Sequence, residues 1–238
     1  MVALDVSSEN KSSNRLVQLL NRVRYRSIET DEDREAVFRL RYEAYRREGI
    51  IDANIRGLFA DDYDEKGNVR LFGVYIDEQL AGSVRIHIAD RSSSTCPSLE
   101  PFRDILEPEI NKNKTIVDST RFVTDKRLSQ EWKGLAYITL RVCWMAIEHF
   151  EADHFLAAVR AEHQAFYRRT FRHRLICPPR TYPLLGAPIC LMSTSYEESV
   201  DSVVRRYPIF RSDAFERRML FGGTGPVKRF LHVAPEVA

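Results

Sequence analysis

The chain has 238 residues, of which 29% are charged and 44% are hydrophobic, and its formal net charge is +2. This is the composition of a soluble globular protein, and the length allows one large domain or two small ones. A net charge so close to zero gives no support for general nucleic-acid binding, so we expect no nucleic-acid partner.

The cysteines and the N-terminus indicate where the protein works. Four cysteines lie far apart, at positions 96, 143, 177 and 190, and no pair has the close spacing of a zinc site or redox motif. We therefore expect reduced thiols in a cytoplasmic protein, and no metal. Residues 1–15 lack the basic start and apolar core of a signal peptide, which predicts a disordered polar tail. No apolar run is long enough to span a membrane.

The N-terminal half predicts a strand, a helix, a loop and three further strands. A short helical turn is expected over residues 16–22, and residues 23–28 alternate apolar and polar side chains as a strand does. Thr30 and the acids after it cap a helix that should end by Gly49. A loop without periodicity follows over residues 50–70. The three strands expected next cover residues 71–76, 80–88 and 115–123, and a short helical piece over residues 102–106 separates the last two.

The C-terminal half alternates helices with strands. Residues 137–150 are apolar on nearly every side, which predicts a deeply buried helix. A strand over 155–159, a helix over 161–171, strands within 175–192 and a helix over 196–206 are expected after it. No linker divides the chain, so we expect one domain over residues 16–238. Antiparallel strands followed by alternating helices and strands predict an α/β (α+β) fold, with a mixed sheet and helices on both faces.

The strand over residues 115–123 carries polar residues in its middle. Asp118, Ser119, Thr120 and Arg121 stand between apolar residues, and burying such groups is costly unless each finds a partner. Strand alternation places Asp118 and Thr120 on one face, and Ser119 and Arg121 on the other. Taken alone, the pattern fits an ordinary strand end with a surface ion pair equally well.

The order of elements is that of the GNAT acyltransferase fold. The segment Glu131-x-x-Gly134-x-Ala136 resembles the loop with which that superfamily holds the coenzyme A pyrophosphate at a helix N-terminus. Acidic Glu131 stands where the superfamily usually has Gln or Arg. The aromatic residues within 164–171 resemble the helix that lies near the acyl thioester in that superfamily.

Four places, read together over residues 20–195, resemble the acyl-homoserine-lactone synthases, and more closely the long-chain N-acyl amino acid synthases. These places are Arg41 with Tyr45, Asp61-x-x-Asp64 with Tyr63, Arg85, and Asp118-Ser119-Thr120-Arg121-Phe122. The resemblance implies a bacterial acyltransferase (EC 2.3.1). It would move a fatty acyl group from acyl carrier protein, or from acyl-coenzyme A, to the amine of an amino acid without a cofactor. Lactone synthesis from S-adenosylmethionine and a non-catalytic acyl-binding module are the alternatives.

Acyl transfer to an amine needs a proton acceptor and a fixed site. We predict Asp118, or a water ordered by Asp61, as the acceptor, with Arg121 as the third catalytic residue. Arginines 41, 85 and 121 should pair with Asp61 and Asp64 and fix the charged loop over the site. The predicted substrate-binding residues are Arg41, Tyr45, Asp64, Arg85, Ser119 and Phe122. The alternative is an ion network that only stabilises the fold.

Residues 160–180 contain six arginines and a single acid, Glu162. A local basic face on a nearly neutral protein suggests an acidic partner, and acyl carrier protein is acidic. Arg168, Arg169 and Arg172 are the predicted docking residues. A simple solvated helix face explains the same pattern.

Overall fold

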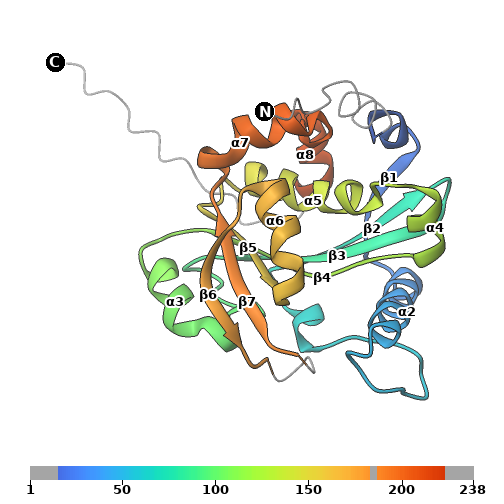
Figure 1. Cartoon of the computed structure of the whole chain (residues 1–238), viewed down its shortest axis with the longest axis horizontal. Helices are drawn as coiled ribbons and strands as arrows, with labels where there is room; N and C mark the ends of the chain where they lie inside the picture. The colour runs from blue at the N-terminus through green and yellow to red at the C-terminus, as the bar shows by residue number, and fades with distance from the viewer. Residues whose placement is uncertain (1–15, 183–186, 223–238) are drawn as a thin grey trace, which may run out of the picture.

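The computed structural model describes residues 16–182 and 187–222 (Figure 1). These residues share one seven-stranded sheet in the order β1-β2-β3-β4-β5-β7-β6. Only β4 and β5 pair in parallel, so the sheet is mixed, as predicted. The strands are β1 (Val23–Ser27), β2 (Val69–Ile76), β3 (Gln79–Ala89), β4 (Ile116–Thr124), β5 (His154–Val159), β6 (Arg174–Arg180) and β7 (Ile189–Thr194).

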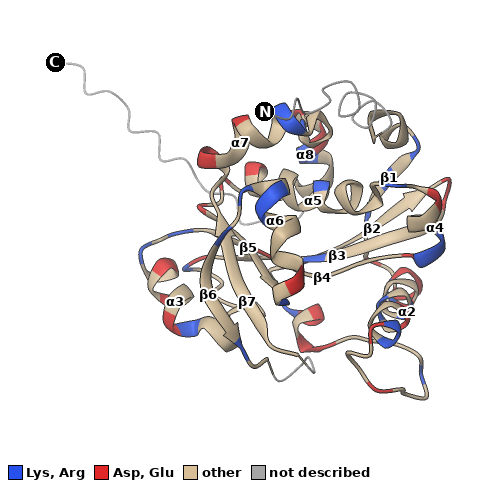
Figure 2. Cartoon of the chain, in the orientation of Figure 1, with Lys and Arg blue, Asp and Glu red and all other residues tan. Residues whose placement is uncertain are grey.

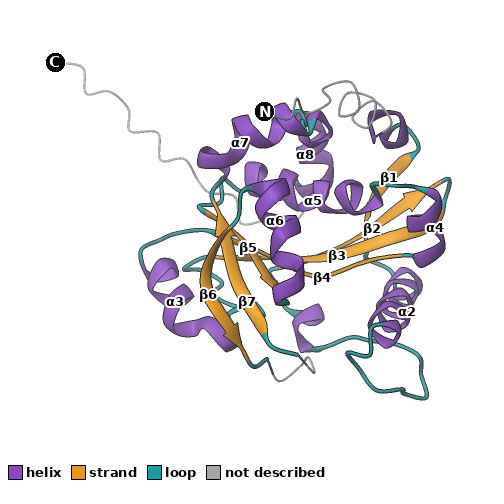
Figure 3. Cartoon of the chain, viewed as in Figure 1, coloured by secondary structure: helices purple, strands orange, loops and turns teal. Residues whose placement is uncertain are grey.

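Helices cover both faces of this sheet (Figure 3). The α-helices are α2 (Asp31–Arg47), α3 (Leu99–Asn111), α4 (Lys126–Glu131), α5 (Leu135–His149), α6 (Gln164–Phe171), α7 (Tyr196–Arg206) and α8 (Ala214–Phe221). On β4, Val117 packs into the core that contains α5, and its neighbour Ile116 packs into the core that contains α3. Strand alternation therefore separates the two layers, and α2 lies on the α3 side (Figure 1).

The predicted elements agree with the structure apart from some boundaries. Helix α2 begins after Thr30, whose hydroxyl accepts the backbone N–H of Asp33 at 3.2 Å, and it ends at Arg47, two residues before Gly49. The helix expected over 161–171 begins instead with a 3-10 turn, η2 (Ala161–His163). The short piece expected near 102–106 is the longer α3, and helices α4 and α8 were not predicted.

Two features of β4 prepare the site. Its pairing with β5 ends at Ser119 and Ala157, although β4 continues to Thr124 and β5 to Val159, so the two strands separate there. On its other side, the register with β3 shifts between Ser83 and Arg85. A shift of this kind is a β-bulge, which bends a strand and redirects its side chains.

Within the described residues, no helix combines the length and apolar character that crossing a membrane requires, and no group of three or more His, Cys, Asp or Glu side chains gathers as a metal site. The predicted tail over residues 1–15 lies outside the described residues.

Candidate active site

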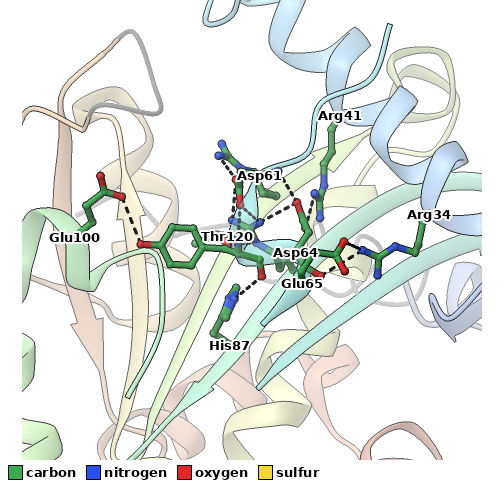
Figure 4. A network of polar contacts seen from close by, with 11 residues as sticks. Arg34, Arg41, Asp61, Asp64, Glu65, His87, Glu100 and Thr120 are labelled. Carbon is green, nitrogen blue, oxygen red and sulfur yellow. Dashed lines mark hydrogen bonds and ion pairs between the residues drawn. The ribbon is translucent and has the colours of Figure 1, made fainter. Parts of the chain in front are cut away.

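Three arginines from three elements meet two aspartates of one loop (Figure 4). Arg41 of α2 donates to Asp64 at 2.8 Å. Arg85 of β3 lies 2.6 Å from Asp61 and 3.1 Å from Asp64. Arg121 of β4 contacts Asp61 through Nη2 at 2.5 Å and through Nε at 3.0 Å. The predicted pairing is therefore present, and it ties the loop to one helix and two strands.

The loop that carries the two aspartates is also held from within. It forms the 3-10 turn η1 (Asp62–Glu65), whose first N–H groups need acceptors. The Asp61 side chain accepts the N–H of Tyr63 at 3.0 Å, and the Asp64 side chain accepts the N–H of Asp61 at 3.0 Å. His87 on β3 contacts the carbonyl oxygen of Tyr63 at 3.0 Å (Figure 4). The turn is thus locked before any ligand binds.

The charges of this network suppress the basicity of the aspartates. Burial alone would raise the pKa of Asp61, but the hydrogen bond from Arg85 and the charge of Arg121 outweigh it, so that pKa lies well below its usual value. Burial also raises the pKa of Asp64, but the charge of Arg41 lowers it, and the net result is a lowered pKa. Burial lowers the pKa of His87 to about 3, which leaves the imidazole neutral at pH 7. A carboxylate of low pKa is a weak general base.

Arg121 lies on a different face from the one that alternation predicted. Its φ is +51°, and two residues of β4, Arg121 and Phe122, stand opposite the single residue Val84 at the bulge. The bulge therefore brings the Arg121 guanidinium to Asp61, beside Arg85 and Thr120. There it lies 4.5 Å from the ring centre of Phe59 and 5.5 Å from that of Tyr45. The prediction that Arg121 shares the face of Ser119 was wrong for this reason.

Asp118 lies elsewhere in the structure. Its carboxylate is fully buried and accepts the backbone N–H of Ser98 at 2.9 Å and the Ser98 hydroxyl at 2.8 Å. Ser98 directly precedes α3, so Asp118 anchors the start of that helix. Burial raises the pKa of Asp118, against the hydrogen bonds from Ser98. Asp118 lines neither pocket described below, although its partner Ser98 lines the smaller one, so its predicted role as proton acceptor stays a prediction.

A pocket of about 400 Å³, called the main pocket below, opens where β4 and β5 separate. Residues 119–124 of β4 form one wall, and Ala158 and Val159 of β5 form another. The C-terminal part of α2 with Tyr45, and the aromatic residues Phe166 and Tyr167 of α6, complete it. Of the predicted substrate-binding residues, Tyr45, Ser119 and Phe122 line this pocket. Arg41, Asp64 and Arg85 are fully or almost fully buried beyond its lining.

The sequence model for the N-acyl amino acid synthase FeeM matches residues 36–195, about two thirds of the chain. The protein belongs to this family. No functionally curated protein matches its sequence significantly. The matched range contains all the predicted site residues, from Arg41 to Arg172, so the resemblance inferred from four short places is confirmed.

Solved structures share the fold of this N-acyl amino acid synthase family member. FeeM from uncultured soil microbes superposes with a TM-score of 0.63 at 18% identity, over 74% of this chain and 92% of that one. The coenzyme A-dependent acyl-homoserine lactone synthase BjaI superposes with a TM-score of 0.54 at 12% identity, over 78% of this chain and 89% of that one. The acyl-homoserine lactone synthase LasI superposes with a TM-score of 0.50 at 12% identity, over 87% of this chain and 98% of that one. The protein is therefore an acyltransferase of GNAT fold, as predicted.

The N-terminus of α5 reaches the main pocket of this synthase family member. Gly134 precedes the helix with a φ of +100°, and Ala136 in its first turn lines the pocket. Acidic Glu131, at the end of α4, is half exposed and lies 3.5 Å from Arg127. The segment thus occupies the place expected for a phosphate loop, with a carboxylate close to it.

The basic face is smaller than the sequence predicted. Arg160 pairs with Glu48 and Glu162, and Arg180 pairs with Asp104. Arg174 lies 3.8 Å from Glu198. Glu48, Asp104 and Glu198 lie outside residues 160–180, so counting the charges within that segment missed them. Arg168 and Arg169 on α6, and Arg172 directly after it, are exposed, and Figure 2 shows the basic stretch of that helix.

Some pocket residues were not predicted. Thr120 lines the main pocket and accepts a hydrogen bond from Arg85 at 3.1 Å. It belongs to the polar motif of β4, which was the sequence signal that could have identified it. Tyr182 lines a second, smaller pocket. It follows β6 in a proline-containing segment without periodicity, so no sequence signal marked it.

Proposed function

We propose that this acyltransferase moves a long-chain fatty acyl group from a carrier thioester to the amine of an amino acid. The observation that carries the proposal is the main pocket at the separation of β4 and β5. Beyond Ser119 and Ala157, the facing backbone groups of these strands no longer bond to each other. They are therefore available to hydrogen-bond the extended, amide-containing arm of the acyl donor. An N–H group there can stabilise the oxyanion that forms when the thioester is attacked.

The lining of the main pocket suits an apolar chain. Val123, Val159 and Phe166 face it, and its volume of about 400 Å³ falls within the usual range of small-molecule sites. Burying each methylene group contributes roughly 0.8 kcal/mol, so a long acyl chain would supply much of the binding free energy. We propose that the acyl donor is consumed as a substrate, and that no cofactor takes part.

The buried network positions substrates rather than accepting the proton. Asp61 is held at a low pKa by Arg85 and Arg121, and Asp118 is bonded to Ser98. We propose that the acceptor amine loses its proton to water before attack, and that the fixed loop and Arg121 orient it.

The pH dependence of the rate tests this assignment. If the amine enters neutral, kcat/KM should rise roughly tenfold per pH unit from about pH 6 and level off at the pKa of the acceptor amine. The rate would be measured with two acceptors whose amines differ in pKa. We expect the break to move with the acceptor. A break at the same pH for both acceptors would identify a base on the protein.

We propose acyl carrier protein as the donor's carrier, because Arg168, Arg169 and Arg172 present a basic face while Glu131 lies beside the expected phosphate loop. Reversing these three arginines to Glu should raise the KM for the acylated carrier about 10- to 100-fold, with kcat unchanged, since steering acts on association. Steady-state kinetics at low and high salt would measure the effect.

The matched control is the triple reversal of Arg56, Arg205 and Arg218, which are also exposed. It changes the net charge by the same amount at other sites, so it should leave the KM for the carrier almost unchanged. Equal use of acyl-coenzyme A by the native protein, unaffected by reversing the three docking arginines, would contradict the carrier assignment.

Product analysis tests the function itself. The native protein would be incubated with hexadecanoyl carrier protein, the twenty amino acids and S-adenosylmethionine, and the products separated by mass spectrometry. We expect an N-hexadecanoyl amino acid. An acyl-homoserine lactone would indicate the alternative synthase activity, and unchanged donor would indicate a binding module.

All four cysteines are buried and free, which supports the proposed cytoplasmic setting.

A further inference from the structure

The hydroxyl of Tyr182 is buried and has no hydrogen-bond partner among the described residues. Tyr182 is only 5% exposed. Leaving a buried hydroxyl unpaired costs free energy, and phenylalanine would fill the same space without that cost. A ligand that completes the hydrogen bond would account for a tyrosine at this position.

Tyr182 lines a cavity of about 50 Å³, called the side pocket below. The two cavities adjoin, because five residues line both of them: Tyr45, Thr120, Arg121, Ala158 and Ile189. A water molecule needs roughly 10–15 Å³ measured in this way. The side pocket therefore has room for about three to five atoms of that size, which is enough for a carboxylate group.

The polar groups of the side pocket are mainly donors. Three carboxylates lie near this pocket. The Asp61 oxygens already accept hydrogen bonds from Arg85 and Arg121, and the Asp118 oxygens accept the N–H and hydroxyl of Ser98. Glu100, whose charge also raises the pKa of Tyr182, accepts from the Tyr63 hydroxyl at 3.4 Å. The Thr120 oxygen accepts from Arg85, which leaves its O–H free to donate. Burial raises the pKa of Tyr182 although the nearby charge of Arg121 opposes this, so its hydroxyl keeps its proton at neutral pH. Donors beside a guanidinium favour an anionic oxygen ligand.

The position of Tyr182 is fixed by its neighbour Arg180. That guanidinium donates to both oxygens of Asp104, at 2.6 and 3.0 Å, and to the carbonyl oxygen of Pro101 at 2.9 Å. Arg180 also pairs in register with Ile189 of β7. The end of β6 is therefore tied to α3, and Tyr182, two residues later, is held over the side pocket.

We infer that the side pocket binds the carboxylate of the acceptor amino acid, and that Tyr182 donates a hydrogen bond to it beside Arg121. The inference rests on the proposed function and adds a specificity-determining residue to it. With its carboxylate in the side pocket, the acceptor directs its amine toward the adjoining main pocket, where the thioester would lie. An amine without a carboxylate would lose this contact.

The test compares wild type with Tyr182→Phe on amino acids and on the amines that lack their carboxylate. The probes are L-tyrosine with tyramine, L-phenylalanine with phenethylamine, and L-leucine with 3-methylbutylamine. For each amino acid that the wild type uses, we expect the KM to rise about 10- to 100-fold, as for the loss of one hydrogen bond to a charged group. The KM for the matching amine should not change.

Melting temperature separates this role from a structural one. Because the variant removes an unpaired buried hydroxyl, it should melt no lower than wild type. Tyr75→Phe, which deletes a hydroxyl lying 3.4 Å from Asp33 and outside both pockets, is the control and should leave every KM unchanged. An unchanged KM for amino acids in Tyr182→Phe, or an equal rise for the amines, would overturn the inference.

Calorimetric titration with the same pairs distinguishes this failure from failure of the proposed function. We expect the wild type to bind the amino acid more tightly than its amine, and Tyr182→Phe to lose that difference. If no acceptor is acylated but this pattern is observed, the acyl-transfer proposal fails and the carboxylate site stands. If acylation occurs and wild type does not distinguish the pair, the carboxylate site is refuted.

Discussion

Replacing Arg121 with alanine should abolish acyl transfer and lower the free energy of unfolding by roughly 3–5 kcal/mol. Arg121 is 5% exposed and makes two contacts with Asp61, so its removal leaves that buried carboxylate with Arg85 as its main partner. The guanidinium also packs against Phe59 and Tyr45 at the wall of the main pocket. Its loss should therefore both release the loop that carries Asp61 and deform the main pocket.

Urea unfolding and turnover of the same preparation would measure both effects. Arg103→Ala is the control, because Arg103 forms an exposed pair with Glu107 and should cost less than about 1 kcal/mol. If Arg121→Ala remains folded at low temperature and turns over normally, the network only stabilises the fold. Normal melting together with normal turnover would show that Arg121 does neither task.

Asp118 should respond very differently to alanine and to asparagine. Asp118→Ala removes the acceptor of two buried hydrogen bonds from Ser98, each worth about 1.5–3 kcal/mol when the acceptor is charged, so α3 should lose its anchor. Asp118→Asn keeps an oxygen for the Ser98 N–H and places its amide beside the Ser98 hydroxyl. It should remain folded and retain most of the activity. Melting curves and kcat would measure both variants.

A base at Asp118 would give the opposite result. Loss of a general base typically lowers the rate by about 10²–10⁴, and the defect would ease as the pH rises. Such a drop in a normally folded Asp118→Asn variant would contradict the anchoring role that the contact with Ser98 indicates.

The difference in unfolding free energy between the wild type and Asp118→Asn should also depend on pH. The folded protein raises the pKa of Asp118, so it binds that proton more tightly than the unfolded chain does. The stability that Asp118 contributes is therefore fully present below the unfolded pKa near 3.8 and is lost as the pH rises through the folded pKa. Relative to Asp118→Asn, the wild type should gain stability as the pH falls. Asp61, whose pKa is lowered, contributes in the reverse sense.

The sequence predicted what depends on local periodicity and capping. The capping residue Thr30, the alternation of β1 and the apolar α5 each reflect chain geometry within a few residues, and the structure confirms them. The polar motif of β4 was also visible, because a carboxylate, two hydroxyls and a guanidinium interrupt a buried strand.

Features that depend on distant partners were not predictable in the same way. The bulge at Arg121 arises from the register with β3, and the Asp118 carboxylate meets Ser98, twenty residues away in the sequence. Arg180, expected on a basic face, pairs with Asp104 of α3. In each case the strand or charge was recognised, but its partner is set by the tertiary fold.

The most direct test of acyl transfer to an amine is the stoichiometry of a single reaction. Hexadecanoyl carrier protein and ¹⁵N-labelled amino acids would be mixed with the native protein, and free carrier thiol and labelled amide measured in the same samples. We expect one N-hexadecanoyl amino acid carrying ¹⁵N for each thiol released. Thiol release with free hexadecanoic acid and no labelled amide would contradict acyl transfer to an amino acid.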